Sequence, residues 1–141
     1  MTRTHEIRPD LDEGIDRKVL TQLRARFMSL NQGRMARAVE GLTPRQQSVL
    51  ALLPLFFHVN HPLLPGYVSS NTPAGLSNFE PDAQALADAQ RLTRSFSYKP
   101  RHGNPPTPIH GLFLMGSLGT LAQADQSDMD VWVCHAPDLS E

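Results

Sequence analysis

Cysteine is nearly absent from this chain, and other features that would assign it to a special class are also missing. Cys134 is the only cysteine among 141 residues, so no disulfide can form within the chain, and a reducing cytoplasm is the simplest setting. Aromatic residues make up only 6% of the sequence, which suits one small globular domain with a modest core. The start of the chain has no apolar signal segment, and the longest apolar run, residues 49–57, is too short to span a bilayer. We therefore expect a cytoplasmic protein without a membrane span.

An excess of charge of either sign is missing too. The chain has 13 Lys and Arg residues and 14 Asp and Glu residues, and this balance gives no argument for a nucleic acid or an anionic membrane as partner. The charges are unevenly distributed, because residues 1–45 hold nine of the basic residues. Most of these lie between apolar residues at helical spacing, and we interpret them as a solvated helix face.

Helical patterns dominate the first two thirds of the chain. Residues 1–15 are polar and without period, and we expect them to be flexible. Apolar residues then recur at steps of three and four from Val19 to Leu42, which predicts a long helix interrupted only by Gly33. This helix opens a helical region that we assign to residues 16–98.

A second helix, over about 44–58, has the clearest start signal in the sequence. Thr43 fits the N-cap, Pro44 fits the first helical position, and Gln46 completes a capping box. Pro54 should kink this helix or remove one backbone hydrogen bond. Its apolar residues indicate burial against the first helix and a further element.

Prolines and glycines then interrupt any period over residues 61–81, which predicts a long ordered or semi-ordered loop of a kind that is often functional. His58 and His61 flank its start at metal-ligand spacing, but no third ligand is evident, so helix-end packing is the favoured interpretation. A third helix is predicted over about 81–95.

The last third of the chain predicts two strands separated by a turn. Residues 99–108 are too rich in proline for regular structure, residues 109–115 predict a buried strand, and residues 129–135 predict a second strand. The expected fold class is therefore α+β, with helices first and strands after them.

Two carboxylates mark the second strand. Side chains of a strand alternate between its faces, so Asp128 and Asp130 should share one face with Trp132. Their Cα atoms would lie roughly 6.5 Å apart, and two charges at that distance repel by on the order of 2–3 kcal/mol at an effective dielectric near 20. A divalent cation such as Mg²⁺ offsets that repulsion and prefers carboxylate oxygens.

The turn between the strands predicts a complementary phosphate site. Gly116-Ser117 follows the first strand and Gly119 comes two residues later, and such residues let backbone N–H groups approach a phosphate. A short helix over 118–124 would add its dipole. The spacing of the aspartates does not match a calcium loop, and no Gly-Lys-Ser/Thr of a Walker loop occurs.

This combination resembles the nucleotidyltransferase superfamily of DNA polymerase beta, in which an apolar residue, Gly-Ser or Gly-Gly and a spacer precede Asp-x-Asp. A narrower resemblance is carried by HPLLPGY at 61–67 and SDMDVWVC at 127–134, which are similar to the N-terminal catalytic region of class I adenylate cyclases of gamma-proteobacteria. The resemblance implies that residues 99–141 begin a polymerase beta-like mixed sheet that is truncated in this chain.

The resemblance also implies a reaction, the Mg²⁺-dependent conversion of ATP to 3′,5′-cyclic AMP and pyrophosphate. By carry-over, Asp128 and Asp130 would be the catalytic residues that hold Mg²⁺, and Gly116 and Ser117 would hold the ATP phosphates. A further carboxylate of the superfamily site and a C-terminal regulatory region with possible protein partners are missing here. We therefore expect a fragment that is inactive alone.

Two alternatives remain open at this point. The chain could belong to another nucleotidyltransferase that moves AMP or UMP to an acceptor, or to a non-catalytic module that binds nucleotide. Three further features have a predominantly structural interpretation. Cys134 fits a small buried hydrophobic residue, Trp132 fits core packing at least as well as nucleotide contact, and the basic residues of 91–101 fit a solvated face better than a triphosphate site.

Overall fold

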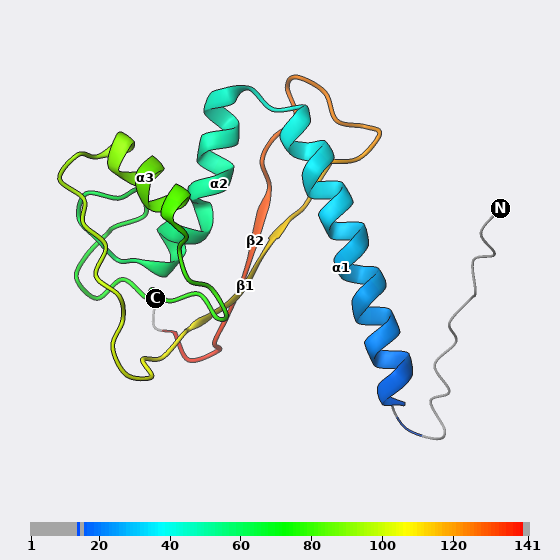
Figure 1. Ribbon diagram of the computed structural model, residues 1–141, viewed down its shortest axis with the longest axis horizontal. Helices are drawn as coiled ribbons and strands as arrows, with labels where there is room; N and C mark the ends of the chain where they lie inside the picture. The colour runs from blue at the N-terminus through cyan, green and yellow to red at the C-terminus, as the bar shows by residue number, and fades with distance from the viewer. Residues whose placement is uncertain (1–13, 15, 140–141) are drawn as a thin grey trace.

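The computed structural model describes residue 14 and residues 16–139, so the flexibility predicted for residues 1–15 lies outside the described residues except at Gly14. Three helices precede a two-stranded antiparallel sheet, which confirms the α+β class (Figure 1). The elements are α1 (Arg17–Glu40), α2 (Pro44–His58), α3 (Ala83–Leu92), β1 (Ile109–Leu114) and β2 (Val131–His135).

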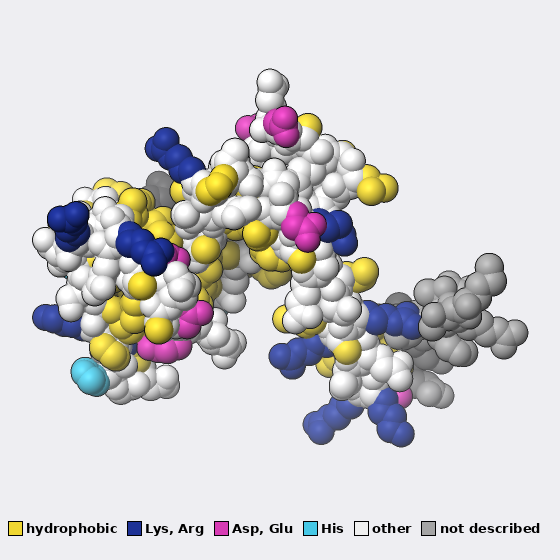
Figure 2. Space-filling model, turned by 45° about the horizontal axis from the view of Figure 1, so that its top comes forward, with side chains coloured by type: hydrophobic (Ala, Val, Ile, Leu, Met, Phe, Trp, Pro, Cys, Tyr) yellow, Lys and Arg dark blue, Asp and Glu magenta, His cyan; other side chains and the backbone are white. Residues whose placement is uncertain are grey.

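Helix α1 begins at the predicted place and runs through Gly33 without a break. Asp16 is its N-cap, accepting a hydrogen bond from the Lys18 N–H at 2.7 Å, and Gly41 is its C-cap. The apolar side chains that define its period are largely exposed in the described structure, Phe27 by 53% and Leu30 by 74%. Lys and Arg side chains surround the projecting part of the helix (Figure 2). The period therefore predicts the helix correctly but overestimates its burial.

Helix α2 has the predicted bounds and the predicted capping box. The backbone N–H of Thr43 donates to Gln46 Oε1 at 2.9 Å, and the backbone N–H of Gln46 donates to Thr43 Oγ1 at 3.4 Å. The helix diverges from α1 and packs mainly against α3 and β1 (Figure 1). The prediction that α2 is buried against α1 is therefore wrong for most of the length of α2.

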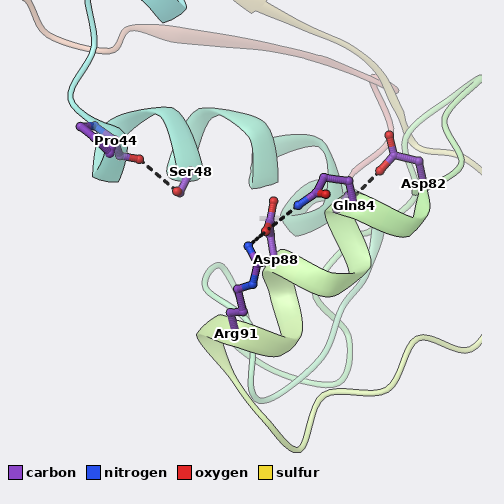
Figure 3. A network of polar contacts seen from close by, with 7 residues as sticks. Pro44, Ser48, Asp82, Gln84, Asp88 and Arg91 are labelled. Atoms are coloured by element: carbon purple, nitrogen blue, oxygen red, sulfur yellow. Dashed lines mark hydrogen bonds and ion pairs between the residues drawn. The ribbon is translucent and has the colours of Figure 1, made fainter.

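Helix α3 is shorter than predicted, with Asp82 as its N-cap rather than in its first turn. The Asp82 carboxylate accepts from the Ala85 N–H at 2.8 Å and fixes the start of the helix at Ala83. On its exposed side Asp88 accepts from Gln84 at 3.0 Å and from Arg91 at 2.7 Å (Figure 3). The Thr93 backbone is extended, which ends the helix before the predicted limit.

The main hydrophobic cluster lies between α2, α3 and the segments on either side of α3. Its buried members are Leu52, Leu55, Leu64, Ala89 and Phe96. The loop over 61–81, which was predicted to be ordered or semi-ordered, is therefore ordered and contributes to the core. It also pairs with the sheet through a parallel bridge between Leu76 and Ile109.

The two strands are less buried than the sequence predicts. Only Ile109 of β1 is fully buried, and four of the five residues of β2 are exposed. Their apolar character predicts strands correctly, but in the described residues the sheet has only two strands, so much of its surface is uncovered. None of the helices in the described part of the chain combines the length and hydropathy needed to cross a membrane.

Candidate functional site

The site begins where the β1–β2 pairing ends. Leu114 pairs with Val131, and one more hydrogen bond, from the Met115 N–H to the Asp130 carbonyl at 2.8 Å, continues the ladder. The chain then turns at Gly116, whose φ of +72° suits glycine. A Cβ added at Gly116 would lie 2.6 Å from Asp130 Oδ2. The structure thus brings the Gly-Ser turn and one of the two predicted carboxylates into direct contact.

Two sequence expectations about this site are wrong. Asp128 and Asp130 do not lie within the second strand, because β2 begins at Val131, and both are exposed in the segment leading into it. Residues 118–124 form turns rather than a short helix, so no helix dipole acts there. β2 begins at Val131 because only one further backbone hydrogen bond, from the Met115 N–H to the Asp130 carbonyl, joins the two segments before the chain turns at Gly116.

The Ser117 side chain ties the two ends of the loop together. Its Oγ lies 2.8 Å from Ser127 Oγ, and Ser127 Oγ also accepts from the Ala124 N–H at 2.9 Å. The Ser117 carbonyl accepts from both the N–H and the hydroxyl of Thr120, at 3.0 and 2.6 Å. Within the described residues, the backbone N–H of Ser117 makes no hydrogen bond, so it is a free donor of this turn.

A second hydrophobic cluster supports the turn from below. Leu118 is completely buried against Ala38 of α1 and Leu42, which follows the C-cap of α1, with Leu114 and Met129 packed around them. Gly119, with φ of +73°, lies so close to α1 that a Cβ there would collide with the Arg34 carbonyl oxygen. The turn therefore sits directly on the C-terminal half of α1 (Figure 1).

Two arginines of α1 bind the turn, and sequence reasoning missed both. Arg34 donates from Nε to the Leu118 carbonyl at 2.9 Å and from Nη2 to the Gly116 carbonyl at 2.8 Å. Arg37 donates from Nε to the Gly119 carbonyl at 3.0 Å. Their spacing predicts a solvated helix face, and this prediction is wrong for both residues, because each binds a backbone carbonyl of the turn. Their partners are backbone oxygens more than eighty residues away, which leave no pattern in the sequence.

The carboxylates offer a small set of oxygen ligands. Asp128 and Asp130 form no ion pair within the described residues, so their oxygens are free to bind a cation. Nowhere in the described part of the chain do three or more His, Cys, Asp or Glu side chains gather as a metal site. Asp130 lies beside the Gly116 turn, and its carboxylate is of the kind that commonly holds Mg²⁺ together with substrate phosphates and water.

The histidine pair lies elsewhere and has a structural role, as the sequence indicates. His58 Nδ1 accepts from the Leu76 N–H at 3.2 Å, and the ring is 5% exposed. Burial, together with the positive charge of Arg101, lowers the pKa of His58. His61 Nδ1 accepts from the Leu63 N–H at 3.1 Å, and its ring meets Phe96 edge-on.

The remaining candidates do not join the site. Cys134 is exposed, so its predicted burial is wrong, because the sheet is uncovered on that side. Trp132 is 64% exposed rather than packed in a core. The segment 91–101 lies beside α3, on the opposite side of the molecule from the turn (Figure 1), which disfavours a triphosphate site built from its basic residues.

Comparisons with known proteins decide the family. The model of the adenylate cyclase NT domain matches residues 19–141. The chain belongs to the adenylate cyclase N-terminal domain family. An adenylate cyclase of Proteus mirabilis is 36% identical over 115 residues, and adenylate cyclases of Salmonella typhimurium and Escherichia coli K12 are 37% identical over 116 and 118 residues.

The adenylate cyclase relatives are much longer than the matched region. Each of these matches covers 80% of this chain but only 13% of the relative, so the chain spans about an eighth of the length of the curated relatives it matches. No solved structure matches the chain.

Proposed function

We propose that this chain provides the phosphate- and metal-binding part of an adenylate cyclase catalytic site, which converts ATP to 3′,5′-cyclic AMP and pyrophosphate. The observation that carries the proposal is the contact between Gly116 and Asp130 in a chain of the adenylate cyclase N-terminal domain family. A turn with a free N–H beside an unpaired carboxylate suits a nucleotide phosphate and its cation.

Within this proposal each site residue has a distinct task. Gly116 and Ser117 bind the ATP phosphates, with the Ser117 N–H as a donor, because the Ser117 hydroxyl is already bonded to Ser127. Asp128 and Asp130 hold Mg²⁺. When bound, Mg²⁺ supplies positive charge that favours ionisation of the ribose 3′-hydroxyl and offsets charge on the phosphates. The position of Asp130 against the turn keeps its carboxylate close to those phosphates.

The proposal extends to the fold. Residues 99–141 begin a polymerase beta-like sheet, and the helical region 16–98 supports it through the contacts of α1 with the turn. In the superfamily that this chain resembles, a further carboxylate completes the site. The described residues have no third carboxylate in a metal cluster with Asp128 and Asp130. We therefore expect the 141-residue chain alone to be inactive.

The test is cyclic AMP formation by the protein expressed from its complete reading frame. Asp128→Asn and Asp130→Asn keep side-chain shape but remove the charge, and each should lower kcat by at least a hundredfold. Asp138→Asn is the matched control, since Asp138 is an exposed carboxylate just beyond β2, and it should leave the rate within twofold. Activity that survives either site substitution contradicts the assigned roles.

Product analysis and binding separate the alternatives. A nucleotide attached to an acceptor, in place of cyclic AMP, identifies a transferase. ATP binding that does not depend on Mg²⁺, without any product, identifies a non-catalytic nucleotide-binding module.

A further inference from the structure

We infer that Arg34 is a positioning residue, which orients the peptide between Gly116 and Ser117 so that its N–H is presented to phosphate. The inference rests on the proposed function and assigns to it a residue from α1 that lies outside the two motifs of the site. Its basis is the set of bonds that Arg34 makes to the turn, compared with those of Arg37 one helical turn further on.

The geometry of a peptide links the two sides of the turn. In a planar trans peptide the C=O of one residue and the N–H of the next point in opposite directions. The Arg34 guanidinium binds the Gly116 carbonyl at 2.8 Å, so this carbonyl faces α1 and the Ser117 N–H faces away from it. Glycine at 116 has little intrinsic preference between peptide orientations, so an external group is needed to select one.

Arg34 is well suited to fix this orientation. It binds the carbonyls of Gly116 and Leu118 with two different nitrogens, so the planar guanidinium spans the turn and limits rotation of both peptides. The close contact of Gly119 with the Arg34 backbone prevents the turn from sliding along the helix. The backbone N–H of Gly119 is already used, since it donates to Gln123 Oε1 at 2.7 Å, which leaves the Ser117 N–H as the donor that Arg34 controls.

Arg37 offers a matched control because it makes the same kind of bond without controlling a free donor. It binds the Gly119 carbonyl at 3.0 Å, and the N–H of that peptide belongs to Thr120. The Thr120 N–H donates to the Ser117 carbonyl inside the turn and is not available to a ligand. Loss of Arg37 should therefore loosen the attachment of the turn to α1 without redirecting a phosphate-binding N–H.

The experiment compares Arg34→Gln, Arg34→Lys and Arg37→Gln in the protein expressed from its complete reading frame. Four quantities are measured: KM and kcat for Mg-ATP, the Kd of inorganic triphosphate by calorimetry without Mg²⁺, and the Tm. Arg34→Gln should raise KM and the triphosphate Kd about tenfold with a smaller change in kcat, as expected for one lost hydrogen bond to a charged group. Arg34→Gln and Arg37→Gln should lower the Tm by similar amounts, but Arg37→Gln should change the KM and the triphosphate Kd less than twofold.

Arg34→Lys separates geometry from charge. Lysine keeps the positive charge but cannot bind two carbonyls in the arginine geometry, so we expect it to recover less than half of the loss in free energy of binding. The inference is overturned if Arg34→Lys has the KM and Kd of the wild type, or if Arg34→Gln and Arg37→Gln have equal effects on them. It is also overturned if Arg34→Gln leaves the triphosphate Kd unchanged, or if the wild-type protein does not bind triphosphate. If the wild type forms no cyclic AMP but binds triphosphate, the proposed function fails and the triphosphate comparison still decides the role of Arg34.

Discussion

The Asp130 carboxylate lies directly over the Cα of Gly116, so that the side chain of any other residue at position 116 would meet Asp130 Oδ2. The two residues are fourteen positions apart and are brought together by the β1–β2 ladder, which ends at the Met115 to Asp130 hydrogen bond. This contact makes the glycine of the Gly-Ser turn a spatial requirement as well as a conformational one.

Replacing Gly116 with alanine should therefore affect both folding and the site. The positive φ alone costs about 1–2 kcal/mol of stability for a residue with a Cβ. The Cβ also has to displace the Asp130 carboxylate, so Mg²⁺-dependent ATP binding should weaken at least tenfold, measured by calorimetry.

Gly103→Ala is the control for Gly116→Ala. Gly103 has a similar φ of +77°, but nothing lies within 4 Å of a Cβ built there. It should show a comparable loss of stability and wild-type ATP binding. Equal binding defects in the two variants would show that the contact with Asp130 is unimportant.

Gly119→Ala should be more destabilising than Gly103→Ala. Both positions have positive φ, but at Gly119 the added Cβ meets the Arg34 carbonyl oxygen, a backbone atom of a helix that cannot rotate aside. Overpacking of this kind costs roughly 1–3 kcal/mol beyond the conformational term. Urea unfolding measures the difference, and similar unfolding midpoints for the two variants contradict the described contact between the turn and α1.

His58 should make the stability of the protein depend on pH in the weakly acidic range. Its pKa is lowered by burial and by Arg101, so the unfolded chain binds a proton near pH 6.5 whereas the folded chain does so only at lower pH. Stability is therefore full above about pH 6.5 and is lost as the pH falls through this value toward the folded pKa. Urea unfolding between pH 7.5 and 5.5 measures the loss.

His58→Asn provides the comparison for this titration. Asparagine lacks the titrating group and retains an acceptor for the Leu76 N–H. The variant should be less stable at pH 7.5, because the ring leaves a cavity, but its stability should change less with pH than that of the wild type. An identical pH dependence in both proteins would assign the effect to other groups.

The basic residues near α3 should have no role in ATP binding. Arg91 forms an exposed ion pair with Asp88 at 2.7 Å, and pairs of this kind contribute at most about 1 kcal/mol. The double substitution Arg91→Gln with Arg94→Gln should leave KM for ATP within twofold and lower stability by less than about 1 kcal/mol. A large rise in KM would return this segment to the candidate site.

Local signals in the sequence predicted local structure well. The capping box at Thr43 and Gln46 fixed the start of α2 at the right residue, because a cap depends on neighbours within one turn. The Gly-Ser and Asp-x-Asp pattern also predicted that the turn and the aspartates lie together, and the structure brings one of the two, Asp130, against Gly116. Antiparallel strands on either side of a short connection bring their facing ends together.

Features that depend on distant parts of the chain were not predicted. Arg34 and Arg37 read as solvated residues, because an exposed arginine and one that binds a backbone carbonyl occupy the same place in a helical period. The burial of β1 and β2 was overestimated for a related reason. The apolar side chains of a strand indicate that other elements pack on the sheet, and the described residues provide few such elements.

The attachment of the turn to α1 has a consequence for the order of folding. The bonds from Arg34, Arg37 and Gln123 join residues that are 82 to 85 positions apart, so they form only after most of the chain has been enclosed in one loop. Contacts with such large sequence separation form slowly, whereas α2 and its capping box need only their neighbours. During synthesis from the N-terminus, α1 emerges long before its partner, so within the described residues the attachment of the turn to α1 forms later than α2 and its cap.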